Sequence, residues 1–151
     1  MPKKIAVITG SKSDLPLVQE ALEVYNKLDI DYSIDVISAH RHPDKLRQWC
    51  VDLGMKDTGV VIACAGMAAA LPGFVASYVD IPVIGVALKG GVADGMDALL
   101  SIISTPKGMG LVCSGVGKSA MINAMITALE ILALSDKDVK GKVSDIKQIY
   151  R

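Results

Sequence analysis

The sequence has few aromatic residues, only two histidines and no excess of either charge. Its 151 residues include one Trp, one Phe and four Tyr, so the core must be built mainly from aliphatic side chains. Sixteen basic residues balance sixteen acidic ones. This balance argues against a broad nucleic-acid or anionic-membrane surface, which would require an excess of Lys and Arg. We therefore expect neither nucleic acid nor a membrane as a partner.

Cysteine chemistry and metal binding have little support. Cys50, Cys64 and Cys113 are widely spaced and form no CxxC pair, which is typical of small buried residues in a reduced cytoplasmic protein. Two histidines without a cysteine cluster do not supply the ligands of a zinc site. The apolar stretch 120–134 is shorter than the ~20 residues that span a bilayer, and no signal peptide is expected at the N-terminus.

Apolar runs alternate with segments of helical spacing, and no linker or repeat interrupts them. Apolar runs predict strands at 5–8, 60–65, 83–88 and 111–113, and the alternation of Tyr32, Ile34 and Val36 with polar residues predicts a strand at 32–36. Helical spacing predicts helices at 18–28, 46–53, around Pro72, 96–103 and 118–134. This alternation predicts a single α/β domain over 1–151, a flavodoxin-like three-layer α/β/α sandwich with a parallel sheet of about five strands. Residues 135–151 are expected to form a solvated C-terminal helical extension.

The segment 118–134 is apolar or small almost all round. A helix without a polar face is normally buried, and one sandwich covers a single side of it. We therefore expect the chain to form a homo-oligomer.

Ligands of such sheets bind beyond the carboxyl ends of the strands, so the loops that follow strands matter most. The first loop holds Ser11, Ser13 and Asp14 at a helix start, where hydroxyls and backbone N–H groups favour a phosphate. A carboxylate would repel that phosphate, so Asp14 suits ribose hydroxyls better. The alternative is that Ser13 or Asp14 only caps the helix.

The second loop combines an acid–base group with anion-binding groups. Arg41 offers a planar fork that suits phosphate, and Ser38 adds a hydroxyl. His40 lies between them and is the best acid–base candidate, because imidazole titrates near neutral pH. The neighbouring His42 is a weaker candidate.

The third loop lacks any ionisable side chain. Its small residues would let a planar heterocycle or a carboxylate approach the backbone closely, although tight helix packing is the competing interpretation. The candidate residues are Gly66, Met67, Ala68, Ala69, Ala70 and Leu71. Gly90-Gly91 is a weaker signal of the same kind.

Taken in order, the motifs GSKSD (10–14), SAHR (38–41), AGMAAALPG (65–73) and GMDALLSI (95–102) resemble the PurE family of N5-carboxyaminoimidazole ribonucleotide mutases. The resemblance implies a step of purine biosynthesis in which a carboxyl group moves from the exocyclic N5 to C4 of an aminoimidazole ribonucleotide. It also implies a cytoplasmic homo-octamer that needs no metal or organic cofactor.

The resemblance assigns roles to individual residues. His40 matches the histidine that removes the C4 proton, and Asp14 matches the ribose ligand. Residues 66–71 match the loop over the base and CO2. The residues that match phosphate ligands are Ser11, Ser13, Ser38 and Arg41.

Three positions depart from the usual bacterial pattern. Ala70 replaces a second histidine, Met67 lies in the same loop, and His42 replaces a threonine. His42 could supply the imidazole that position 70 lacks. The run AGMxxALP is also similar to pyridinium-biscarboxylate mononucleotide synthases, so a carboxylase of another nucleotide, such as a nicotinate nucleotide, stays open. A non-catalytic nucleotide-binding protein is the third alternative.

Overall fold

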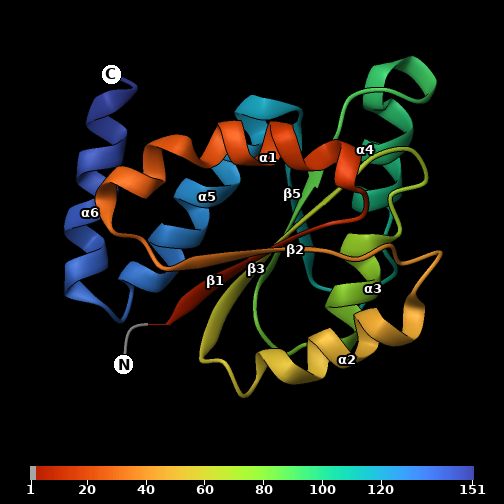
Figure 1. Cartoon of the computed structure of the whole chain (residues 1–151), viewed down its shortest axis with the longest axis horizontal. Coiled ribbons are helices and arrows are strands. Elements are labelled where there is room, and N and C mark those ends of the chain that lie inside the picture. The colour runs from red at the N-terminus through yellow and green to blue at the C-terminus, as the bar shows by residue number, and fades with distance from the viewer. Residues whose placement is uncertain (1–2) are drawn as a thin grey trace.

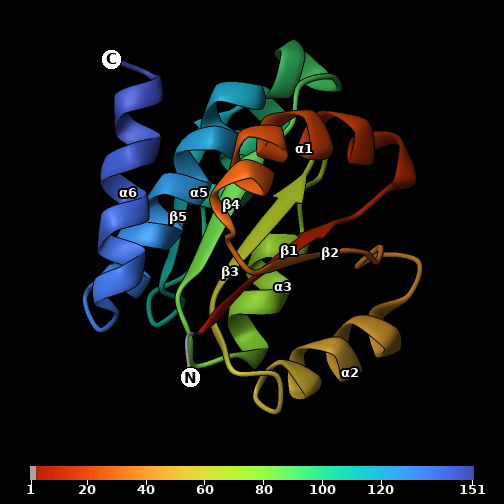
Figure 2. The ribbon, with the colours of Figure 1, turned by 60° about the vertical axis from the view of Figure 1, so that its left-hand side comes forward.

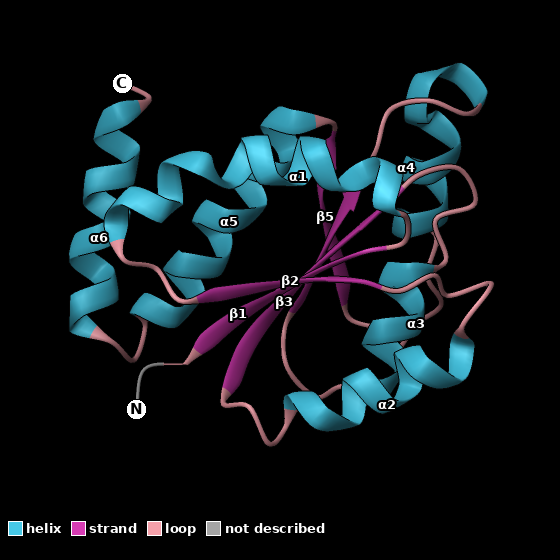
Figure 3. Ribbon diagram, viewed as in Figure 1, coloured by secondary structure: helices cyan, strands magenta, loops and turns pink. Residues whose placement is uncertain are grey.

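Five parallel strands form one sheet in the computed structural model, which describes residues 3–151 (Figure 3). Their order is β2-β1-β3-β4-β5, and every neighbouring pair is parallel. The strands are β1 (Lys4–Thr9), β2 (Tyr32–Val36), β3 (Thr58–Ala65), β4 (Val83–Ala87) and β5 (Leu111–Val116). This order is that of flavodoxin-like sheets, whose strand order reverses between β1 and β3. The predicted fold class is therefore confirmed.

The central strands are buried on both faces, as helices on each side require. All eight residues of β3 and all five of β4 are buried. Strands buried on both faces appear in the sequence as continuous apolar runs rather than as alternating patterns. These two strands could therefore be predicted from the sequence. The edge strands β2 and β5 keep partly exposed residues.

Helices cover both faces of the sheet (Figures 1 and 2). One face is covered by α1 (Leu15–Leu22) and α5 (Lys118–Ala133), and α6 (Lys137–Ile149) packs on α5. The other face packs against α2 (Pro43–Leu53), α3 (Leu71–Tyr78) and α4 (Met96–Ile103). Short 3-10 helices add the segments Lys12–Asp14, Glu23–Leu28 and Val92–Gly95.

The first helix is shorter than its apolar spacing indicates. The α-helix ends at Leu22, and a 3-10 helix continues to Leu28 before Asp29 turns into the left-handed region with φ 50°. Tyr25 lies in this tighter segment, fully buried, and its hydroxyl donates to the backbone oxygen of Ile122 at 3.0 Å. The 3-10 segment thus still packs on α5.

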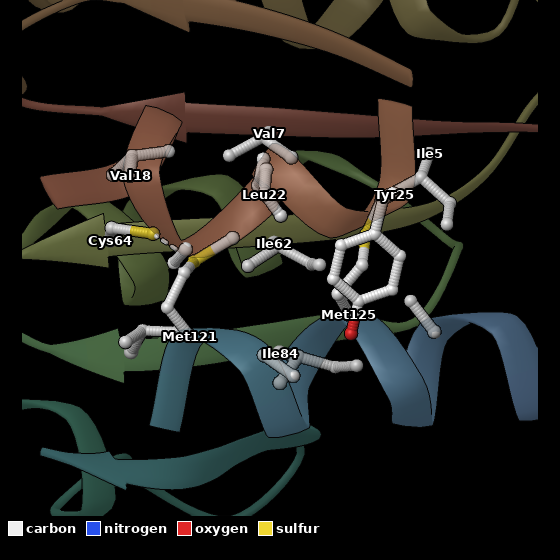
Figure 4. Close-up of a cluster of buried hydrophobic side chains, with 14 of the residues drawn as sticks. Ile5, Val7, Val18, Leu22, Tyr25, Ile62, Cys64, Ile84, Met121 and Met125 are labelled. Carbon is white, nitrogen blue, oxygen red and sulfur yellow. Dashed lines mark hydrogen bonds between the residues drawn. The ribbon is translucent and has the colours of Figure 1, made fainter. Parts of the chain in front are cut away.

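The expectations for the last two helices need correction. Helix α5 does have a narrow polar stripe, because Ser119, Asn123, Thr127 and Glu130 are all exposed. Its apolar residues pack on the sheet and on α1 and α6, and Figure 4 shows Met121 and Met125 among the side chains of this core. Helix α6 is not simply solvated, since Ile146 is fully buried. The chain itself therefore covers more of α5 than the sequence suggested.

Within residues 3–151, no helix is both long and apolar enough to cross a membrane.

Candidate functional site

Three of the predicted loops begin at neighbouring strand ends on one edge of the sheet. Strand β1 lies between β2 and β3, and its last residue, Thr9, is paired with Val36 on one side and Cys64 on the other. The backbone N–H of Ile37 donates to the Thr9 oxygen at 2.9 Å, which fixes the start of the second loop beside the first. The structure thus brings these loops together at the point where the strand order reverses, where this fold binds ligands.

The first loop presents two hydroxyls beside each other. Ser11 and Ser13 place their Oγ atoms 2.8 Å apart, and the backbone N–H of Ser13 donates to Ser11 Oγ at 3.2 Å. Both side chains are exposed at the start of the 3-10 helix Lys12–Asp14. A phosphate at this point would meet hydroxyl donors and the backbone N–H groups of a helix start.

Asp14 occupies the N-cap position of α1, but its carboxylate makes no capping hydrogen bond. Instead, the buried Thr9 hydroxyl donates to Asp14 Oδ2 at 3.3 Å. Partial burial raises the pKa of the Asp14 carboxyl, and the hydrogen bond from Thr9 opposes that rise. The simple helix-cap interpretation of Asp14 is therefore wrong, and the carboxylate remains available at the edge of the sheet.

The second loop is a compact turn that leaves both histidines exposed. Ser38 uses its hydroxyl to accept from the backbone N–H of Arg41 at 3.2 Å, and its carbonyl accepts from His42 N at 2.9 Å. Because the turn is closed by Ser38, the side chains of His40 and Arg41 project from it into solvent. His42 occupies the N-cap position of α2, followed by Pro43 in the first turn.

The third loop divides into buried and exposed positions. Ala69 and Leu71 are each 2% exposed and pack into the core, whereas Met67, Ala68 and Ala70 are exposed. Gly66 is half-buried. Met67 adopts φ 55°, a left-handed conformation that is uncommon for a residue with a large side chain. The exposed backbone of this loop, rather than its side chains, is what a planar ligand would meet.

The structure adds a fourth loop to the same edge, between β4 and α4. The N–H of Leu88 donates to the Ala65 oxygen at 3.0 Å, so this loop lies beside the third one. It is held by Asp94 and Asp97, whose carboxylates accept from the backbone at Gly90 and Val92. Gly90-Gly91 was the sequence signal for this loop, but nothing in the sequence joined it to the others.

This edge can bind an anion and transfer protons. It offers the guanidinium of Arg41, several hydroxyls and helix starts for a phosphate, and the imidazole of His40 for acid–base chemistry. The described residues 3–151 hold no cluster of three or more His, Cys, Asp or Glu side chains that could bind a metal.

Two surface hollows lie elsewhere on the molecule. One, of about 680 Å³, has Lys3, Asp31 and Lys142 in its walls and lies where β1 and β2 begin. The other, of about 470 Å³, lies where β4 begins and includes Asp80 and Pro82. Neither is lined by a residue of the four loops, so the candidate site is defined by the loop geometry.

Comparison with known proteins decides the family. The family model described as AIR carboxylase matches residues 4–151, which is nearly the whole chain. The chain belongs to the AIR carboxylase family. This match confirms the resemblance that the loop motifs indicated.

Relatives of the family are similar over almost their full length. An N5-carboxyaminoimidazole ribonucleotide mutase of Pyrococcus abyssi is 40% identical over 148 residues, covering 98% of this chain and 83% of the relative. The protein of the same name from Escherichia coli K12 is 37% identical, covering 95% and 85%. That of Saccharolobus solfataricus is 38% identical, covering 100% and 94%.

Solved structures support the fold. The crystal structure of Treponema denticola PurE superposes with a TM-score of 0.86 at 23% identity, covering 98% of this chain and 91% of that one. At this identity the likeness establishes the fold alone.

Proposed function

We propose that the protein converts N5-carboxyaminoimidazole ribonucleotide into 4-carboxy-5-aminoimidazole ribonucleotide, a mutase step of purine biosynthesis. Full-length similarity to mutases of that name supports the proposal. The observation that carries it is the position of His40 on an exposed turn after β2, the strand paired with β1, whose own loop carries the Ser11–Ser13 hydroxyl pair. An acid–base group there faces the ligand end of the fold.

Substrate binding is assigned to the first two loops. The phosphate binds the hydroxyls of Ser11, Ser13 and Ser38 and the guanidinium of Arg41, whose planar fork can make two parallel hydrogen bonds to phosphate oxygens. Asp14 accepts hydrogen bonds from the ribose hydroxyls. Because the cationic Arg41 binds the phosphate and the anionic Asp14 binds the ribose, the nucleotide is oriented with its base toward the third loop.

One imidazole can carry the proton transfers. The N5–carboxyl bond breaks to release CO2, and the N5 nitrogen takes a proton from the His40 imidazolium. The ring carbon C4 then bonds to that CO2, and neutral His40 removes the C4 proton. Protons and electrons balance over the cycle, so the scheme needs no metal or organic cofactor. Residues 66–71 close over the base and CO2 and limit access of water.

His42 is proposed as an accessory group. It holds the N-cap position of α2, and Ala70 holds that of α3, the helix that packs beside α2 on the same face of the sheet. An imidazole at position 42 therefore projects from the same edge as the loop that lacks one.

The active form is proposed to be a cytoplasmic homo-octamer. An exposed apolar stripe on α4 supports self-association, because Met96, Leu100 and Ile103 are each about half exposed at helical spacing. Val112 on the edge strand β5 is also 60% exposed, on the face of the sheet that carries α5. Light scattering at eight times the 15.9 kDa chain mass is the expected result, and a monomer would contradict it.

The decisive test is the mutase assay on three proteins in parallel. Wild type should form the ring-carboxylated product, and His40→Asn should lose about 10²–10⁴-fold in turnover while it still binds the nucleotide. His42→Thr should lose turnover by a smaller factor, as expected for an accessory group. Binding without conversion by wild type would favour the non-catalytic alternative. Carboxylation of a nicotinate nucleotide with bicarbonate would instead establish the other carboxylase.

A further inference from the structure

Thr9 is a polar residue in an apolar place. It ends β1 and is fully buried, and among residues 3–151 only Thr58 joins it as a buried polar or charged residue. A buried hydroxyl is costly unless it is hydrogen-bonded. The side chain of Thr9 points to the α1 face of the sheet, the face shared by Val7 and Ile5, two and four positions earlier.

The partner of Thr9 is the carboxylate of Asp14, five residues later. The hydroxyl donates to Oδ2 at 3.3 Å, across the turn that carries Ser11 and Ser13. This distance is longer than the usual ~2.8 Å of a hydroxyl donor. With Oδ2 engaged by Thr9, the second carboxylate oxygen, Oδ1, is the acceptor left for another donor.

The surroundings of the pair keep water away from its inner side. Cys64 is paired with Thr9 in the register of β1 and β3, is fully buried, and contacts Met121 of α5 at 3.3 Å (Figure 4). Cys64 is also the titratable group that lies against Asp14 from β3, and its own pKa is raised by burial. The Thr9 hydroxyl is therefore the group on the core side that can orient the carboxylate.

We propose that Thr9 is a positioning residue that orients the Asp14 carboxylate for the ribose hydroxyls of the substrate. The inference rests on the proposed function, in which Asp14 is the ribose ligand. Thr9 does not touch the substrate. It acts through Asp14, so its contribution belongs to binding rather than to the carboxyl transfer itself.

Steady-state kinetics of Thr9→Val test this role, because valine keeps the shape and removes the hydroxyl. Loss of one hydrogen bond to a charged group predicts a rise in KM of about fivefold to tenfold with kcat within twofold of wild type. Thr9→Ser restores the hydroxyl and should restore KM. Thr58→Val is the matched control. It removes the other buried threonine hydroxyl, which lies at the first residue of β3, away from the carboxyl ends of the strands where the site lies, and it should leave KM unchanged.

A double-mutant cycle with Asp14→Asn tests whether Thr9 acts through the carboxylate. It is measured as affinity for aminoimidazole ribonucleotide by calorimetry, so it does not depend on turnover. Thr9→Val should weaken binding in the wild-type background and have no further effect beside Asp14→Asn. Equal effects in both backgrounds, or an unchanged KM in Thr9→Val, would overturn the inference. Wild type that binds but does not turn over would overturn the mutase proposal alone.

Discussion

Replacing Ile146 by alanine should destabilise the protein substantially, because α6 is part of the core. Ile146 is fully buried, and Val143 and Val139, one and two turns earlier, pack against the same cluster. The substitution removes three carbon atoms, and at ~0.8 kcal/mol for each buried carbon the loss is about 2.4 kcal/mol. Because α6 forms an outer layer that can partly collapse, we expect a total near the lower end of the ~2–5 kcal/mol range for such changes.

Ile149→Ala is the matched control for Ile146→Ala. It lies in the same helix but is 55% exposed, so its loss should be below about 1 kcal/mol. Any gain in helix propensity is shared by the two variants and cancels between them. Urea unfolding followed by circular dichroism gives the free energies, at one protein concentration because association adds stability. Equal losses of unfolding free energy for the two variants would refute the packing of α6 on the core. They would support the original expectation that residues 135–151 form a solvated extension.

Further predictions concern charge, thiols and glycine. Burial raises the pKa of Asp14 above its ordinary 3.8, so its ionisation opposes folding as pH rises through the raised pKa. Asp14→Asn should therefore have a higher urea midpoint than wild type at pH 7, with the advantage shrinking toward pH 3.8; a lower midpoint at pH 7 would contradict this. Burial raises the pKa of Cys50 to about 11 and also that of Cys64, so native protein at pH 8 should resist alkylation at both, as mass spectrometry would show. Gly85→Ala should cost about 1–3 kcal/mol, since its Cβ would lie 2.6 Å from Ile102 Cγ2, whereas Gly141→Ala, at an exposed position of α6, should stabilise the protein.

The centre of the sheet was predictable because β3 and β4 are buried on both faces. A strand such as β3 leaves an uninterrupted apolar run, and glycine or proline marks the connections between strand and helix.

The stripe of polar residues on α5 was also present in the sequence, at spacings of four, four and three from Ser119 to Glu130. Its narrowness hid it, because a stripe of one residue per turn leaves most of the helix apolar.

The site was predictable only as a set of loops. The rule that ligands bind at the carboxyl ends of parallel strands located Ser11, His40 and Arg41 on one edge. The role of Thr9 was not accessible, because within an apolar run a threonine is read as one more strand residue. The role of this threonine depends on the face of β1 that it occupies. It also depends on the turn after β1, which brings the Asp14 carboxylate within hydrogen-bonding distance of its hydroxyl.

Backbone strain differs between the two ends of the parallel strands. The described residues include five non-glycine residues with positive φ: Asp29, Asp57, Met67, Ala93 and Asp94. Aspartate tolerates this conformation because its short polar side chain can hydrogen-bond locally, and Asp29 and Asp57 lie in turns that lead into β2 and β3. Met67 and Ala93 have no such compensation, and both lie in loops that leave the carboxyl ends of β3 and β4. Uncompensated strain persists where the surrounding structure enforces it, and it clusters at functional sites. The positive φ angles of Met67 and Ala93 therefore indicate the same ends of the strands as the hydroxyls, the guanidinium and the imidazole do, and they are independent of those side chains.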